Sequence, residues 1–234
     1  MVEKNELKPW QKEQWCIPTV SAEFVCRMED VLELYAEPFK AWQPVVCVDE
    51  RPCVLHADTR PPTPAKPGQK ARFDYEYQRN GTCNLFMLYQ HGAGWRHAKV
   101  TEQRTKTDFA HLMRDLVDVH FPQAEKIRVV LDNLNTHTPA SLYVAFAPAE
   151  ARRILSKLEF HFTPKHASWL NMVEIELSVL VHQCLKRRIA DIDTLQREVT
   201  AWQTARNAQS ATIRWMFDVA QARTKLATLY PVLS

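Results

Sequence analysis

The stretch Val129-Val-Leu-Asp-Asn-Leu-Asn-Thr-His-Thr138 joins a short apolar run to an acid and then to a polar segment. The apolar residues from Ile127 to Leu131 predict a buried β-strand, and Asp132 follows them directly. A carboxylate at the end of a buried strand costs free energy unless a cation neutralises it. We therefore expect a metal ion at this strand end and further acids elsewhere in the chain that share it.

The composition of the 234-residue chain is that of an ordinary globular protein, with 46% hydrophobic and 24% charged residues. A net charge of +3 permits a nucleic acid as partner without arguing for one.

The chain has six cysteines, which form neither a C-x-x-C pair nor a zinc-site spacing, and it shows no signal peptide. These features favour a reducing cytoplasm. No apolar run approaches the ~20 residues of a membrane span. With four glycines and neither Gly-rich phosphate-loop motif, nucleotide-binding loops are also disfavoured.

A second strand is predicted from Val45 to Val48, and it too is followed by an acid, Asp49. Ligands of open α/β sheets bind at strand ends, so Asp49 and Asp132 are expected to lie close together. Mg²⁺ takes oxygen ligands, usually a few carboxylates together with water and substrate phosphates. Two such ions about 3.5–4 Å apart can hold the attacking and leaving oxygens of a phosphodiester displacement, which then needs no protein general base.

A helix predicted near 168–185 carries the third candidate acid. Its apolar residues recur at helical spacing around Leu177. Glu174 lies closer to the centre of this apolar stripe than Glu176, so the pattern places Glu174 nearer the packed face. Spacing alone leaves an alternative open, because acids at strand ends and helix edges are also common as solvated residues and helix caps.

The order of predicted elements favours an α/β fold, a mixed sheet with helices on its faces. Turn signals in close succession, including Asn80-Gly81, indicate antiparallel neighbours among the first strands. Besides the two strands above, strands are predicted at 72–77, 84–90, 94–100 and 158–163. Helices are predicted from the cap Ser21 to Pro38, from the cap Thr107 to Val119, and near 139–146, 148–156, 191–206 and 212–229.

Several side chains near these acids have two open interpretations. His137 is either a loop histidine with satisfied hydrogen bonds or a contact to substrate phosphate. Trp169 either packs in the core or stacks on a base. A run of basic residues is either solvated surface charge or a phosphate-binding face; it consists of Lys165, His166, Lys186, Arg187 and Arg188.

Taken in order, five segments resemble a known family. They are Val46-Cys-Val-Asp-Glu50, Gly81-Thr-Cys-Asn-Leu-Phe86, Val129 to Thr138, Phe162-Thr-Pro-Lys-His-Ala-Ser-Trp-Leu-Asn-Met-Val-Glu174, and the closing Ala222-Arg-Thr-Lys-Leu with Leu229-Tyr-Pro231. The set resembles the catalytic domain of bacterial insertion-sequence transposases of the mariner-like superfamily, which are DDE superfamily endonucleases. The resemblance runs from about Leu7 to Pro231.

The resemblance implies an RNase H-like mixed sheet flanked by helices and a site for two Mg²⁺ ions, with Mn²⁺ as substitute. Mapped by motif, Asp49, Asp132 and Glu174 are its catalytic and metal-binding acids. The implied function is strand cleavage and strand transfer in cut-and-paste transposition of an insertion sequence. The implied partners are double-stranded DNA, at element ends and a TA target, and a second copy of the chain in a homodimer on DNA.

The family's motifs also favour DNA contacts for His137, Lys165, Trp169 and Asn171. Family members usually carry an N-terminal pair of helix-turn-helix modules that read the terminal repeats, and this sequence has no room for them. It is therefore expected to be either half of a split frame, with a separate upstream helix-turn-helix polypeptide as partner, or a truncated remnant. The remnant would act only in DNA binding or assembly. A different RNase H-like nuclease, acting on RNA–DNA hybrids, is a further alternative that the motifs disfavour.

The expected organisation has three parts. Residues 1–40 form an N-terminal arm and linker helix, 41–190 form the RNase H-like catalytic domain, and 191–234 form C-terminal helices packed on it. The expected location is the bacterial cytoplasm, at the nucleoid.

Overall fold

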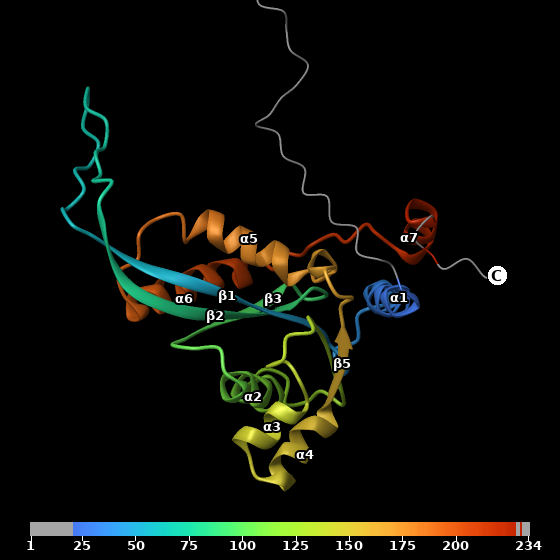
Figure 1. The fold of residues 1–234 in the computed structure, drawn as a ribbon. Helices are drawn as coiled ribbons and strands as arrows, with labels where there is room; N and C mark the ends of the chain where they lie inside the picture. Colours follow the sequence, from blue (N-terminus) through green and yellow to red (C-terminus); the bar gives the residue numbers. More distant parts are fainter. Residues whose placement is uncertain (1–20, 228–229, 231–234) are drawn as a thin grey trace, which may run out of the picture.

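A computed structural model describes residues 21–227 and 230, in which five strands form one mixed sheet (Figure 1). The strand order is β3-β2-β1-β4-β5. β1 is antiparallel to β2, and β2 to β3, whereas β1 is parallel to β4, and β4 to β5. The strands are β1 (Val45–Asp58), β2 (Tyr77–Gln90), β3 (Trp95–Thr101), β4 (Ile127–Leu131) and β5 (Leu158–Phe162). The predicted mixed sheet is confirmed.

Helices cover both faces of this sheet, which is why the central strands are apolar on both sides. Val46 and Val48 of β1 face one core cluster, while Val45 and Cys47 face the other. The first cluster lies under α2 (Lys106–Asp115), its π-helical extension (Leu116–His120), α3 (Ala140–Ala145) and α4 (Pro148–Lys157). The second lies under α5 (Val173–Gln183) and α6 (Ile192–Ala208). A third, smaller cluster joins α1 (Ala22–Ala36) to α7 (Val219–Lys225).

The outer edge of the sheet is closed by side chains of α6. The backbone N–H groups of Arg96, Ala98 and Val100 on β3 donate to the side-chain oxygens of Asn207, Gln203 and Gln196, respectively. An edge strand otherwise presents unpaired backbone groups to solvent.

Within the described part of the chain, none of the helices is long and apolar enough to cross a membrane.

β1 and β2 extend far beyond the rest of the sheet, and the loop 59–76 that joins them projects from the body of the molecule (Figure 1). The predicted strand 72–77 and the predicted turn at Asn80-Gly81 are therefore wrong. Residues 72–76 lie in the loop, with Phe73 77% and Tyr75 82% exposed, so their alternation does not reflect burial. Gly81 lies within β2 at a φ of +100°, which favours glycine.

Helix starts show which local signals are reliable. Ser21 caps α1 as predicted, its Oγ accepting from Phe24 N at 3.2 Å. The predicted cap Thr107 is wrong, because Thr105 forms a capping box with Asp108 and starts α2. The predicted helix 212–229 is reduced to α7, because residues 211–218 form no regular secondary structure. Their apolar side chains recur at every second position; Ile213, Trp215 and Phe217 pack against core clusters. The predicted arm at 1–20 lies outside the described residues.

Candidate active site

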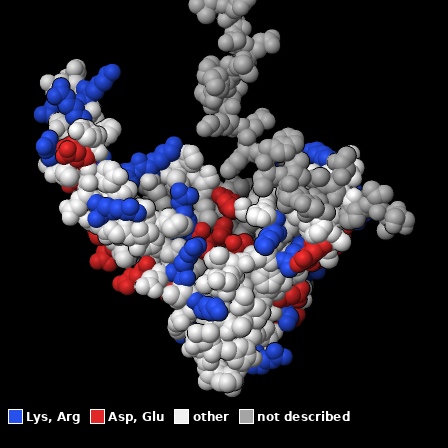
Figure 2. All heavy atoms as spheres, in the orientation of Figure 1, with Lys and Arg blue, Asp and Glu red and all other residues white. Residues whose placement is uncertain are grey.

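One pocket of about 500 Å³ brings the three predicted acids together. Asp49 lies on β1, Asp132 directly follows β4, and Glu174 is in the first turn of α5. β1 and β4 are parallel neighbours in which Cys47 pairs with Val130, so the residues just beyond this pair lie near each other at the same edge. Figure 2 shows acidic side chains gathered in a hollow near the start of α5, with basic side chains around it.

Asp49 forms no salt bridge within the part of the chain that the structure describes. Its Oδ1 accepts a hydrogen bond from Glu50 N at 2.8 Å. Burial, with further contributions from the neighbouring carboxylates Glu50, Glu174 and Asp132, raises the pKa of Asp49 to about 7. Carboxylates that repel one another in a pocket create a site in which a divalent cation is favoured.

Asp132 is held by hydrogen bonds on one oxygen. Its Oδ1 accepts from Leu134 N at 3.2 Å and lies 2.7 Å from His137 Nδ1. Burial opposes the ionised form, but the contact with His137 outweighs it, so the pKa of Asp132 is lowered. His137 Nε2 in turn lies 3.0 Å from Glu50 Oε2. Burial lowers the pKa of His137, but the bonds to Asp132 and Glu50 raise it to about 9.

The donor set fits a hard divalent cation. Within the described residues, no three His, Cys, Asp or Glu side chains lie close enough as they stand to hold one ion. Mg²⁺ does not require such a group, because it usually keeps several waters and takes one or two carboxylates plus substrate phosphates. Hydrogen bonds within the described chain engage Oδ1 of both Asp49 and Asp132 and leave Oδ2 available. All three acids also border the same open pocket.

The apolar pattern of α5 was wrong about which glutamate is buried. Glu176 is 0% exposed, whereas Glu174 is partly exposed at the pocket. Glu176 lies 3.1 Å from Arg96 Nε and accepts from Arg206 Nη2 at 2.9 Å. Arg96 and Arg206 thus neutralise Glu176. It lies on a side of α5 that the apolar stripe around Leu177 predicted to be more exposed than the side of Glu174. The choice of Glu174 therefore rests on the family motif and the pocket.

Two of the predicted DNA contacts are buried. His137 is 0% exposed and Asn171 is 1% exposed. Asn171 Nδ2 donates to Val48 O at 2.9 Å, which ties the segment before α5 to β1 next to Asp49. In this structure both residues contact the framework of the pocket, so the predicted direct contact with DNA is not supported for either.

The segment between β5 and α5 presents the exposed candidates Lys165, His166 and Trp169. Trp169 is 48% exposed, and its ring packs edge-on against Phe217 with the centroids 5.6 Å apart. The ring therefore packs on the protein in part, and stacking of its exposed part on a base stays a prediction.

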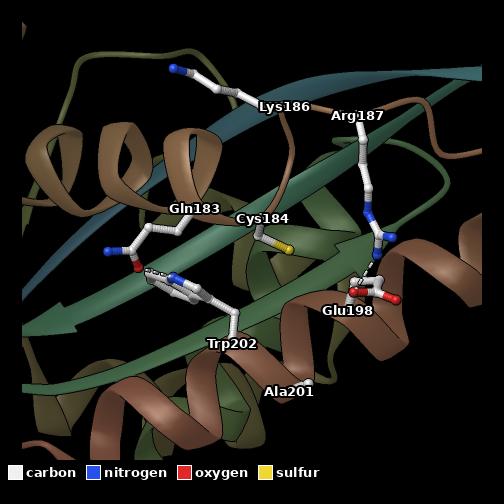
Figure 3. A pocket seen from close by; sticks show the side chains of 7 residues that line it. All are labelled: Gln183, Cys184, Lys186, Arg187, Glu198, Ala201 and Trp202. Atoms are coloured by element: carbon white, nitrogen blue, oxygen red, sulfur yellow. Dashed lines mark hydrogen bonds and ion pairs between the residues drawn. The ribbon is translucent and has the colours of Figure 1, made fainter. Parts of the chain in front are cut away.

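The basic run after α5 divides into two parts. Lys186 and Arg187 border a pocket of about 430 Å³ beside α6. Arg187 Nη2 lies 2.5 Å from Glu198 Oε2, whereas the side chain of Lys186 points away from Glu198 (Figure 3). Arg188 instead bonds Asp58 at 2.8 Å and the carbonyl oxygens of Glu76 and Tyr75. Arg188 is thus engaged at the base of the projecting hairpin of β1 and β2.

Sequence reasoning missed several residues that line the pocket of the acids. Ser178 and His182 follow Glu174 at intervals of four on α5, a helical spacing that could have found them. Arg51 and Arg104 also line it, and Arg104 Nη1 lies 3.0 Å from Glu50 Oε1. No local pattern distinguishes Arg104, because it lies in a loop after β3.

Comparison with known proteins defines the class of this fold and site. Residues 44–196 match the model of the DDE superfamily endonucleases, so the chain belongs to this family and to its nuclease-type enzymes. No curated protein matches the sequence significantly.

Among solved structures, the chain is similar to the Mos1 mariner transposase. The paired-end complex with Mn matches with a TM-score of 0.56 and 14% identity over 86% of this chain and 62% of that chain. The strand transfer complex matches with a TM-score of 0.56 and 14% identity over 87% and 60%, respectively. The likeness shows the RNase H-like fold, and this chain spans about three-fifths of the Mos1 chain.

Proposed function

We propose that this chain is the catalytic domain of a transposase that cleaves and joins DNA strands with divalent metal ions. Mg²⁺ is the proposed ion, with two per site, and Mn²⁺ its substitute. The observation that carries the proposal is the pocket lined by Asp49, Asp132 and Glu174 within a DDE endonuclease domain. The similar Mos1 structures, which include complexes with Mn and with Mg, support the choice of ions.

The residues of the pocket have distinct proposed roles. Asp49, Asp132 and Glu174 supply carboxylate oxygens to the ions. The bound ions would polarise the phosphodiester and activate water or a DNA 3′ hydroxyl as nucleophile. Arg51 and Arg104 border the same pocket and provide positive charge for the phosphates of a bound strand.

The proposed substrate is double-stranded DNA at the ends of an insertion sequence and at a TA target. Joining two ends to one target favours a homodimer on DNA. We propose that the protein acts at the nucleoid of a bacterial cell. We also propose the division into 1–40, 41–190 and 191–234; the hydrogen bonds from α6 to β3 support the packing of the last part on the catalytic domain.

Cleavage of supercoiled plasmid DNA tests the proposed activity. Nicking is expected in Mg²⁺ and in Mn²⁺, with and without element ends on the plasmid, and is expected to stop in EDTA. Equal nicking in EDTA would contradict a metal-dependent reaction. Binding to DNA without nicking in either ion would favour the alternative, an inactive remnant that acts only in DNA binding or assembly.

The exposed basic residues Lys186 and Arg187 give a second prediction. If both contact phosphates, Lys186→Ala with Arg187→Ala lowers DNA affinity and reduces the slope of log affinity against log salt by about 1 per contact. Fluorescence anisotropy at several salt concentrations measures the slope. Arg152→Ala, on the exposed surface of the distant helix α4, serves as control. An unchanged slope in the double variant would show that the pair does not touch DNA.

A further inference from the structure

We propose that His137 and Glu50 form a positioning pair that fixes the carboxylate of Asp132 relative to that of Asp49. The inference rests on the proposed function, because it assigns these two residues a role toward the metal site. Neither contacts the reacting atoms in this account, and neither is proposed as a metal ligand.

The pair is buried, and its two side chains are in contact. The side chain of His137 is 1% exposed, and that of Glu50 is 4% exposed. His137 Nδ1 lies 2.7 Å from Asp132 Oδ1, and Nε2 lies 3.0 Å from Glu50 Oε2. Phe109 packs on the imidazole with a centroid separation of 4.8 Å. Arg104 Nη1 contacts the other oxygen of Glu50 at 3.0 Å, so each end of the pair has a fixed partner.

Glu50 connects the two strands that carry the acids. Its backbone N–H donates to Asp49 Oδ1 at 2.8 Å, and its side chain reaches Asp132 through His137. Asp132 Oδ1 also accepts from Leu134 N. Hydrogen bonds therefore hold Oδ1 of each acid and, within the described chain, leave Oδ2 of each without a hydrogen bond. Partners of this kind orient metal-binding carboxylates, and their loss typically costs about 10–100-fold in metal affinity or activity.

A second histidine provides a matched comparison. His161 also lies between two carboxylates, with Nδ1 2.8 Å from Asp30 and Nε2 3.0 Å from Glu159. None of these three residues lines the pocket of the acids. If bridging two carboxylates served only to hold strands and helices together, replacement of either histidine would affect stability and leave metal binding unchanged.

A paired exchange removes both members of the bridge together. Glu50→Gln with His137→Gln replaces both by neutral side chains, so neither member is left as a buried charge without its partner. A single glutamine amide at 137 cannot occupy both positions of the ring nitrogens. The control is Glu159→Gln with His161→Gln. Metal-free proteins are titrated with Mn²⁺ and followed by electron paramagnetic resonance of the free ion, and thermal unfolding is recorded for each.

The exchange at the pocket is expected to weaken Mn²⁺ binding about 10–100-fold, while the control binds as the wild type does. Wild-type affinity in the folded pocket variant would overturn the positioning role. If that variant does not unfold cooperatively, Glu50→Gln alone is titrated; weaker binding supports the role and unchanged binding overturns it. Failure of the wild type itself to bind Mn²⁺ would contradict the proposed function, and the positioning role with it.

Discussion

Replacement of Asp132 by asparagine is expected to reduce metal-dependent DNA cleavage by at least about 1,000-fold. Bound metal ions contribute several kcal/mol to stabilising the charge of a phosphodiester transition state, and each 1.36 kcal/mol corresponds to about tenfold in rate. Asparagine keeps an oxygen for the hydrogen bonds from Leu134 and His137 but loses the charge that binds the ion. The side chain of Asp132 is 39% exposed, so the change in folding stability is expected to be small.

Nicking rates at saturating Mn²⁺, measured with thermal unfolding of the same samples, test this prediction. The matched control is Asp30→Asn, which makes the same exchange in an aspartate that is 47% exposed and paired with His161. Asp30→Asn is expected to cleave as the wild type does. Equal cleavage by Asp132→Asn would remove this residue from the metal site.

Replacement of Glu176 by alanine is expected to lower the free energy of unfolding by about 3–5 kcal/mol, because it leaves a buried charge uncompensated. Arg96, the partner of Glu176, has a side chain that is 0% exposed, so water cannot replace the lost carboxylate. Arg206 loses its two contacts to Glu176 as well. For a chain of this size the melting temperature should fall by roughly 10 °C.

Glu198→Ala is the matched control for this second prediction. Glu198 also pairs with an arginine, Arg187, but their side chains are 33% and 58% exposed. Exposed ion pairs contribute about 0–1 kcal/mol, so its effect should be small. Urea unfolding of both variants measures the difference. A loss at Glu176 no larger than that at Glu198 would show that Arg96 is compensated in another way.

Local patterns in the sequence were sufficient for the strands that carry the first two acids. The apolar runs before Asp49 and Asp132 predicted buried strands, because both faces of the sheet are covered. The position of Asp49 at a strand end was wrong, since β1 continues to Asp58 against its antiparallel partner β2. The length of that hairpin depends on pairing between distant segments, which has no signal in a local window.

The buried charges of the site could not be predicted for a similar reason. Arg96 lies on the same face of β3 as Ala98 and Val100, where α6 covers it and Glu176 neutralises it. His137 is buried because Glu50 and Asp132 meet around it, and these residues are far apart in the chain. Only the fold brings such partners together, so the residues around the acids needed the structure.

Asp49, Asp132 and Glu174 are proposed to hold the divalent metal ions of the active site. Crystals of the protein soaked in Mn²⁺, with anomalous diffraction recorded at the manganese edge, test this proposal most directly. Anomalous density is expected in the pocket, next to the carboxylates of Asp49 and Asp132. A saturating soak that gives no density there, or gives it only on other side chains, would contradict the account.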